Sequence, residues 1–325
     1  MNSFRFLFIW TLFCGATLIF SYSYHRPEIS NELLFPNEKM KQSVRIVSYN
    51  IRGDNQKDRV EGNSWDIRKY KIQTLMNYYE PDVMGFQEVN ISFMPDLEAL
   101  FPAYQIIAFD ITPRDKDAVL LINKKRFTCK KYDSFWLAQD PADQTSDSWG
   151  SRTTRIVVYA HLIDLHTNKE LFVYCTHFDG YSFDARCESA ILLRDQVRAI
   201  SGDAPSVVTG DFNLFPDEQP QKIYDILCAY NCLHDVRDIS QGNHFGPDGT
   251  WIGWRYDRSS APLGAVGARL DNIFLRNAAV VREGVLNAKI IADSGVVCET
   301  HEVPVDTPYS SDHLPVIVDI ALSKD

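Results

Sequence analysis

The feature that most constrains this chain is a repeated arrangement in which a short apolar, β-type run ends in an acidic, amide or imidazole side chain. Examples are Val-Ser-Tyr-Asn, Gly-Phe-Gln-Glu and Tyr-Cys-Thr-His. The residues in these positions, in chain order, are Asn50, Glu88, His177, Asp211, Asn213, Asp271, Asp312 and His313. Oxygen ligands and imidazoles collected at strand ends suit a magnesium-assisted attack on phosphorus. The arrangement therefore predicts an enzyme.

Composition limits which partners the chain can attract. It has 325 residues, of which 45% are hydrophobic, enough to pack the core of one large domain or of two. The formal net charge of −10 does not draw the protein to a polyanion. A phosphate substrate must therefore be held locally, by a metal ion and a few arginines.

The amino terminus resembles an export signal. Arg5 precedes an apolar run from Phe6 to Phe20, and small residues follow it. The run is short for a bilayer span but suits a secretory signal; a buried amino-terminal helix is the third alternative. We predict a signal peptide or membrane anchor at residues 1–23, a polar tether at 24–42 and a catalytic domain at 43–325. The protein is then exported (periplasmic or extracellular), or membrane-anchored with the catalytic domain outside the cytoplasm.

Strand-like and helical segments alternate along the domain. Short runs rich in β-branched and aromatic residues predict strands, at 44–49, 83–86, 104–109, 118–122, 156–162, 171–175, 207–209, 272–275 and 316–320. Apolar periodicity predicts helices at 66–79, 187–200 and 221–230. This order favours an α/β fold with two mixed sheets packed together and helices outside. The segment 241–268 has the length of a functional loop.

Taken together, the motifs resemble the endonuclease/exonuclease/phosphatase superfamily from about Val44 to Ala321. Pro81-Asp82-Val83, Phe135-Trp136-Leu137 and Ser148-Trp149-Gly150 resemble a bacterial branch related to the carbon-catabolite-repressor-type deadenylases. The resemblance implies a deoxyribonuclease I-like fold, a four-layer α/β sandwich. One departure is that Arg114-Asp115-Lys116-Asp117 stands where this branch usually has a glycine-rich segment with a Gly-Glu pair.

The resemblance implies a Mg²⁺ site, with Mn²⁺ as the alternative ion. Glu88 is the expected primary ligand, because Mg²⁺ keeps several waters and needs one or two protein carboxylates. Asn50 is expected to be a direct oxygen ligand or to act behind the ligands, where it also positions Asp211. Asp312 is expected to face the metal directly or through water.

The implied catalytic residues are His177, Asp211, Asn213, Asp271 and His313. Asp211 would act as a base or orient the attacking water, and Asn213 would donate from its amide to a phosphate oxygen. His313, oriented by Asp271, and His177 on the opposite side would hydrogen-bond the phosphate in the transition state.

Substrate binding is assigned to Arg155, Trp251 and Arg269. An arginine beside a strand can instead form an ion pair, and a tryptophan can instead pack in the core, so both alternatives remain open for these residues.

The predicted activity is metal-dependent hydrolysis of phosphodiester bonds by in-line water attack, most simply by a monomeric nuclease on single-stranded nucleic acid. The alternative is an exported phosphatase or lipid-headgroup phosphodiesterase acting on inositol phosphates or sphingomyelin, with association with a membrane through the amino-terminal segment. A third hypothesis, from a different class, is a binding module that has lost catalysis.

Overall fold

Two six-stranded β-sheets face each other in the computed structural model of the protein. The first has the strand order β11-β12-β1-β2-β4-β3 and the second β5-β6-β7-β8-β10-β9. Both are mixed, because β1 pairs with β2 and β7 pairs with β8 in parallel while the other pairs are antiparallel. The structure describes residues 35–40, 42–112, 115–240, 242, 244–254, 268–286 and 309–322.

The strands are β1 (Val44–Asn50), β2 (Val83–Asn90), β3 (Tyr104–Ala108), β4 (Asp115–Asn123), β5 (Phe127–Trp136), β6 (Ile156–Asp164), β7 (Glu170–His177), β8 (Ser206–Asp211), β9 (His234–Asp235), β10 (Asp271–Arg276), β11 (Ala279–Val285) and β12 (Val316–Ala321). The α-helices are α1 (Gln56–Val60), α2 (Trp65–Tyr79), α3 (Met94–Leu100), α4 (Phe183–Ser201), α5 (Pro220–Cys228) and α6 (Val236–Ile239), with short 3₁₀ turns at Ile91–Phe93 and Ala229–Asn231.

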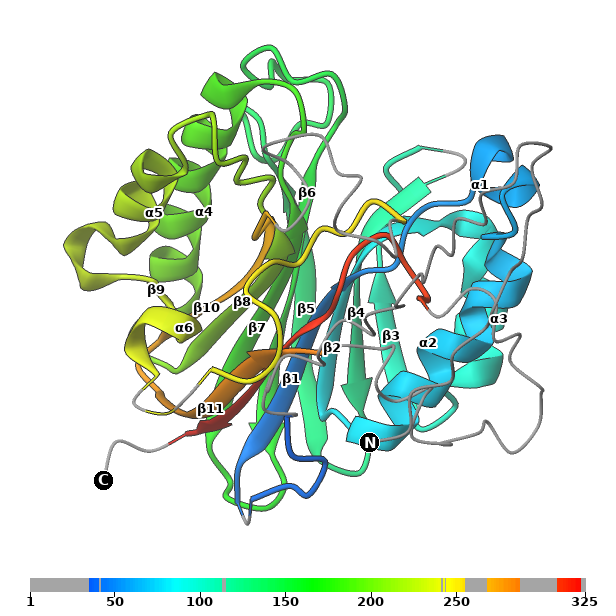
Figure 1. Cartoon of the computed structure of the whole chain (residues 1–325). Coiled ribbons are helices and arrows are strands. Elements are labelled where there is room, and N and C mark those ends of the chain that lie inside the picture. Colours follow the sequence, from blue (N-terminus) through cyan, green and yellow to red (C-terminus); the bar gives the residue numbers. More distant parts are fainter. Residues whose placement is uncertain are drawn as a thin grey trace, which may run out of the picture. The chain divides into compact units, whose positions relative to one another are not determined.

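Helices cover the outer face of each sheet, which gives four layers (Figure 1). Helices α2 and α3 pack against the first sheet through an apolar cluster that includes Ile72, Leu75 and Leu97. Helix α4 and helix α5 cover the second sheet in the same way, through Leu193, Val197 and Ile223 among others. The predicted four-layer sandwich of the deoxyribonuclease I-like type is therefore confirmed.

Local sequence signals start and stop the helices. The hydroxyl of Ser182 accepts a hydrogen bond from the backbone N–H of Ala185 (3.1 Å) and caps the start of α4. Gly202 follows the last turn with φ of 55°, a left-handed conformation that glycine adopts without strain. Pro220 begins α5, where its missing N–H costs no helical hydrogen bond.

The strand register collects the polar strand ends in one row. Asp211 lies opposite His177 on parallel β7 and opposite Asp271 on antiparallel β10. In the other sheet, Asn50 at the end of β1 lies opposite Gln87, the neighbour of Glu88. The polar strand ends of the two sheets lie close together because both sheets direct these ends to the same side of the molecule.

The sequence predicted the central elements and missed several peripheral ones. Each predicted strand and helix overlaps an observed one, whereas β5, β9, β11 and the short helices α1, α3 and α6 were not expected. Strand β5 (Phe127–Trp136) is an edge strand with many exposed residues, so it lacks the apolar run that marked the others.

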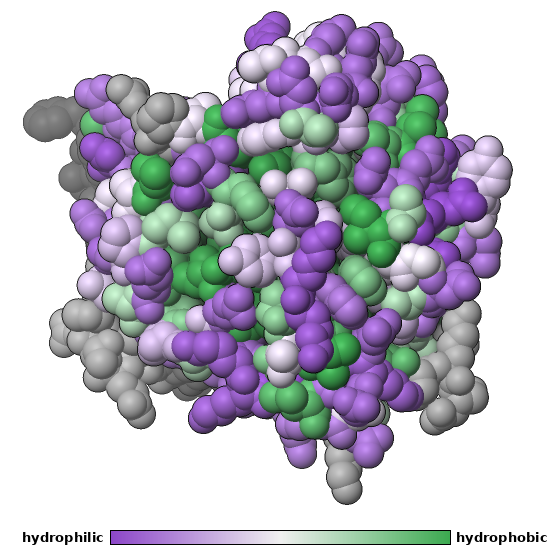
Figure 2. Space-filling view, turned by 180° about the vertical axis from the view of Figure 1, so that it is seen from behind, coloured by the Kyte–Doolittle hydropathy of each residue, from purple (hydrophilic) through white to green (hydrophobic). Residues whose placement is uncertain are grey.

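The predicted leader at residues 1–23 lies outside the described residues, as does most of the tether. Within the described part of the chain, no helix is long and apolar enough to cross a membrane. On the face drawn in Figure 2, hydrophobic side chains form small groups among hydrophilic ones. Such scatter is usual for protein surfaces.

The two sheets approach each other closely at Gly85 in β2. A Cβ atom added there would lie 2.0 Å from Oγ1 and 2.9 Å from Cβ of Thr209 in β8, and 3.2 Å from Sγ of Cys175 in β7. The glycine therefore lets β2 and β8 pack face to face, two strands that carry site residues at their ends.

We expect Gly85→Ala to lower the free energy of unfolding by about 1–3 kcal/mol, because overpacking a filled core forces neighbouring strands apart. Urea denaturation of the variant and of wild type measures the difference. Gly242→Ala is the matched control, since the nearest atom to its added Cβ is 4.0 Å away. Equal stability of Gly85→Ala and wild type would contradict the close approach.

Candidate active site

The side-chain amide of Asn50 joins the ends of the two sheets. Its Nδ2 donates to Oε1 of Glu88 in the first sheet (3.0 Å) and to Oδ2 of Asp211 in the second (2.9 Å). The amide oxygen accepts from the backbone N–H of Arg52 (3.0 Å). Asn50 is completely buried, so these bonds fix both carboxylates. This geometry matches the predicted positioning of Asp211, with the amide nitrogen, not the oxygen, directed at the acidic groups.

Glu88 lies in a bulge of β2. The pairing of β2 with β4 shifts between Phe86 and Val89, and Glu88 has φ of 60°, which is left-handed. Bulges next to active sites re-aim a side chain in this way. The backbone N–H of Gly53 donates to its Oε2 (2.8 Å). Burial disfavours the carboxylate, but the charges of His177 and Arg52 outweigh burial and lower the pKa of Glu88 to about 2.

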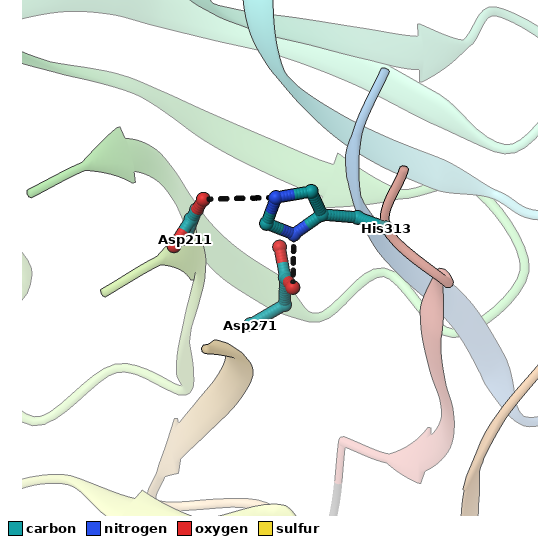
Figure 3. A group of neighbouring side chains, drawn as sticks. All are labelled: Asp211, Asp271 and His313. Carbon is teal, nitrogen blue, oxygen red and sulfur yellow. Dashed lines mark hydrogen bonds and ion pairs between the residues drawn. The ribbon is translucent and has the colours of Figure 1, made fainter. Parts of the chain in front are cut away.

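His313 and Asp271 form a buried pair. Nδ1 of His313 lies 2.7 Å from Oδ2 of Asp271, and Nε2 of the same ring lies 3.9 Å from Oδ2 of Asp211 (Figure 3). Burial opposes protonation of the imidazole, but Asp271 and Asp211 raise the pKa of His313 to about 10. At neutral pH both ring nitrogens therefore carry hydrogen, and Nε2–H can donate to a substrate oxygen next to Asp211.

His177 forms a second pair of the same kind on the other side of Asp211. Nδ1 of His177 lies 2.8 Å from Oδ1 of Asp117, and Nε2 lies 3.6 Å from Oδ2 of Asp211. Burial and the charge of Arg155 oppose protonation, yet Asp117 and Asp211 leave the pKa of His177 above 6.5. Burial also opposes ionisation of Asp117, but His177 and Arg155 hold the pKa of Asp117 well below its usual range.

Asp211 is thus bracketed by two imidazoles, each oriented by its own carboxylate. Its Oδ1 accepts from the backbone N–H of Asn213 (3.0 Å). Burial and the neighbouring charge of Asp271 raise the pKa of Asp211, against the opposite effect of His177 and His313. A carboxylate with a raised pKa accepts a proton more readily than an ordinary one, which suits a general base.

The predicted role of Asn213 as a donor to phosphate stays a prediction. Its Nδ2 donates to the carbonyl oxygen of Phe178 (3.0 Å) and lies 3.2 Å from Nε2 of His177. Asn213 thus contacts both the His177 ring and the loop behind it.

The carboxylates of buried Asp312 and half-buried Glu88 are close enough to influence each other's charge. Burial and the charge of Glu88 raise the pKa of Asp312, while His313 and Arg52 act in the opposite direction. Nη1 of Arg52 lies 3.3 Å from Oδ2 of Asp312, but the same guanidinium also bonds Asp58 through Nε (2.8 Å). Because Arg52 shares its positive charge between Asp312 and Asp58, repulsion between the carboxylates of Asp312 and Glu88 remains. A divalent cation would reduce this repulsion.

A different trio lies close enough to hold one ion. Among the described residues, one ligand atom each of Asp211, Asp271 and His313 lies within 4.8 Å of the others. This set differs from the predicted ligands Asn50, Glu88 and Asp312. This trio and the Glu88–Asp312 side both offer oxygen ligands of the kind that Mg²⁺ prefers.

The three predicted substrate-binding residues have different surroundings. Nη1 of Arg155 contacts Oδ2 of Asp117 (2.7 Å) and Nδ1 of His177 (2.8 Å), which places the guanidinium in the site. Trp251 forms a β-bridge with His313 and so runs beside it. Arg269 instead pairs with buried Asp235 (2.7 Å), which is the ion-pair alternative.

Asp117 and Arg52 are the site residues that the sequence did not reveal. Asp117 lies in the segment that departs from the bacterial branch, and the structure shows that this segment still supplies an acidic side chain to His177. Arg52 follows Asn50 by two positions but carries no strand-end signature of its own. The signal available in the sequence for both residues was a charged side chain close to a polar motif at a strand end.

Comparison with known proteins identifies the class. Residues 47–313 match the endonuclease/exonuclease/phosphatase family, so the chain belongs to this family of phosphoester hydrolases. An endonuclease/exonuclease/phosphatase from Bacteroides vulgatus is 26% identical, with a TM-score of 0.72 over 87% of this chain and 100% of that one. A mannosyl-6-phosphatase from Bacteroides thetaiotaomicron is 24% identical, with a TM-score of 0.71 over 86% and 99%.

The finer resemblance to carbon-catabolite-repressor-type deadenylases has loose support. The catalytic domain of human Nocturnin with a bound sulfate anion is 21% identical, with a TM-score of 0.60 over 88% of this chain and 97% of that one. Likeness at this identity shows the fold alone. The chain spans about half the length of the curated relatives it matches, 47% and 46%.

We expect His313→Ala and Asp271→Asn each to lower kcat by roughly 10²–10³, the usual loss when one charge-stabilising donor is removed. The double variant should be little worse than the poorer single variant, because residues acting as a unit are not additive. Steady-state kinetics measures this, and cooperative melting checks the fold. Near-normal kcat in the single variants, or losses that multiply, would refute the paired role.

We expect Asp117→Asn to lower the pKa of His177, because the carboxylate that stabilises the imidazolium is removed while burial and Arg155 still oppose protonation. NMR titration of the His177 ring in wild type and variant measures the shift. Asp133→Asn, an exposed acid on β5, is the control. An unchanged or higher pKa of His177 in Asp117→Asn would show that the pair does not exist.

Proposed function

We propose that the protein is a Mg²⁺-dependent phosphodiesterase that cleaves single-stranded nucleic acid by in-line attack of water. The observation that carries this proposal is Asp211 held between two carboxylate-paired imidazoles, next to the acids Glu88, which is half-buried, and Asp312, which is buried. This combination supplies a proton acceptor, two hydrogen-bond donors and a cation site within one strand-end row.

Each residue of the site has a separate role in the proposed reaction. Asp211, fixed by Asn50 and by the backbone N–H of Asn213, accepts the proton of the attacking water. His313 and His177 donate from Nε2 to the non-bridging phosphate oxygens, whose charge grows in the transition state. Asp271 and Asp117 hold the two rings through Nδ1, so their orientation is set before the substrate binds.

Glu88 and Asp312 would hold the metal ion, with Asn50 and Gly53 orienting the Glu88 carboxylate. Bound Mg²⁺ polarises a phosphoryl oxygen and offsets the negative charge of the transition state. With the ion held by these acids, Arg52 would keep its pair with Asp58.

A sugar phosphatase is the second candidate, supported by the likeness to the Bacteroides mannosyl-6-phosphatase. The two candidates differ in the bond that is cleaved, a phosphodiester or a phosphomonoester. A hydrolysis panel of single-stranded RNA, single-stranded DNA, mannose 6-phosphate, inositol phosphates and sphingomyelin, each with Mg²⁺, separates them. Turnover of the monoesters without turnover of the nucleic acids would replace the first proposal with the second.

We expect EDTA to abolish turnover and added Mg²⁺ to restore it, because Glu88 and Asp312 offer the oxygen ligands that this ion prefers. Mg²⁺ should also raise the melting temperature of wild type but not of Glu88→Gln, which gives a readout independent of activity. Asp271→Asn tests the alternative trio. If Asp271→Asn loses the Mg²⁺ stabilisation while Glu88→Gln keeps it, the ion binds with Asp211 and His313 instead.

We also propose that residues 1–42 export the protein, on the basis of Arg5 and the apolar run behind it. Fusion of this segment to a reporter active only outside the cytoplasm should give a signal. Replacing Leu12 and Leu18 by aspartate, which interrupts the apolar run, should abolish that signal. A well-expressed but silent wild-type fusion would contradict export.

A further inference from the structure

An exposed tyrosine and an exposed arginine form a pair at the edge of the active site. Tyr181 follows β7 and has an exposed fraction of 62%. The guanidinium carbon of Arg152 lies 4.4 Å from the centre of its ring. Most tyrosines of the described structure are at least half-buried, so the exposure of this ring leaves aromatic surface available to a ligand.

One buried carboxylate holds both members of the pair. Oδ1 of Asp179 accepts from the backbone N–H groups of Tyr181 (2.9 Å) and Ser182 (2.7 Å). Oδ2 accepts from the backbone N–H of Arg152 (3.2 Å) and the hydroxyl of Ser151 (2.8 Å). Asp179 is only 1% exposed. Burying an acid between two surface segments fixes the segments relative to each other, so the ring and the guanidinium have a preformed backbone support.

The pair is a direct continuation of the catalytic loop. The carbonyl of Phe178 accepts from Asn213, and a Cβ at Gly180 would lie 3.6 Å from Nδ2 of Asn213. Tyr181 is the next residue, and consecutive Cα atoms are about 3.8 Å apart. His177 itself is four positions before Tyr181. The tyrosine is therefore close along the chain to His177, which the proposed function places against the substrate phosphate.

We propose that Tyr181 and Arg152 bind the nucleotide next to the scissile phosphate, the base stacking on the tyrosine ring and the neighbouring phosphate pairing with the arginine. This inference rests on the proposed phosphodiesterase function and identifies how the substrate is held. Stacking on an aromatic ring combined with a nearby cation is the usual way to bind single strands without reading their sequence. An acidic protein needs such a local contact, because its net charge repels the strand.

The test compares substrates with and without a base. Full-length protein with Mg²⁺ is given a short single-stranded thymidylate and an abasic strand of the same length. Wild type should prefer the thymidylate in kcat/KM by roughly 5- to 150-fold, the range that one stacked base contributes. Tyr181→Ala should remove the preference, because kcat/KM for the thymidylate falls to the level of the abasic strand. Tyr181→Phe should retain it, because the ring is kept.

Arg152→Gln should weaken the binding of both strands to the same extent. It should also reduce the slope of log KM against log salt by about 0.7, the value for one lost phosphate contact on a single strand.

Tyr230→Ala is the matched control for Tyr181→Ala. Tyr230 is also exposed (76%) and lies under two arginines, Arg194 and Arg198. Arg198 is 15 residues along α4 from Phe183, about 22 Å from the catalytic end of that helix, so the control should behave as wild type.

Failure of the inference and failure of the proposed function give different results. Hydrolysis of both strands with no preference, or a preference that survives Tyr181→Ala, overturns the inference alone. If neither strand is cleaved, the function fails, and calorimetry decides the inference: thymidine 5′-monophosphate should bind wild type more tightly than deoxyribose 5-phosphate, and Tyr181→Ala should not distinguish them. Loss of mannose 6-phosphate turnover in Tyr181→Ala, with thymidylate unaffected, would make the pair a sugar-binding site and overturn the proposal.

Discussion

The amide group of Asn50 is the contact on which the active site depends. It donates one hydrogen to Glu88 and one to Asp211, and these carboxylates belong to different sheets. Two carboxylates at one buried point repel each other, and a neutral donor between them reduces that repulsion without adding a charge that would displace a metal ion. The geometry between Glu88 and Asp211 is therefore set by a side chain that is itself fixed, because its oxygen accepts from the backbone N–H of Arg52 and it is completely buried.

Around this bridge the site has an approximate two-sided symmetry. Asp211 lies between His177 and His313, and each ring is bound at Nδ1 by a carboxylate from a further strand, β4 or β10. The parallel pairing of β7 with β8 and the antiparallel pairing of β8 with β10 produce this arrangement, since they bring His177 and Asp271 level with Asp211. A slip of one residue in either pairing would turn one partner to the opposite face of the sheet. The register of the second sheet is thus a requirement of the chemistry as well as of the core.

The sequence was sufficient for the architecture because the central strands are buried on both faces and appear as continuous apolar runs. It also identified Asn50, Glu88, His177, Asp211, Asp271, Asp312 and His313 as neighbours, because each lies at or near one end of such a run. It could not identify Asp117, whose segment departs from the bacterial branch, or the direction in which Asn213 points. Orientation of a side chain and long-range pairing between a carboxylate and an imidazole are tertiary properties, and spacing along the chain does not encode them. For the same reason the sequence alone does not choose between an ion pair and substrate binding for Arg269.

Backbone conformation connects the site to the packing beneath it. Arg52, Glu88, Asp117 and Asn213 all have left-handed φ angles, between 50° and 62°. Such a conformation costs of order 1 kcal/mol or more for a residue other than glycine and persists only where the surroundings determine it. Here each of the four is held by a hydrogen bond to another site residue or by the bulge in β2, and the strands below are locked together where Gly85 faces Thr209. The unfavourable local geometry at the site is thus balanced by these hydrogen bonds and by the close packing of the two sheets beneath it.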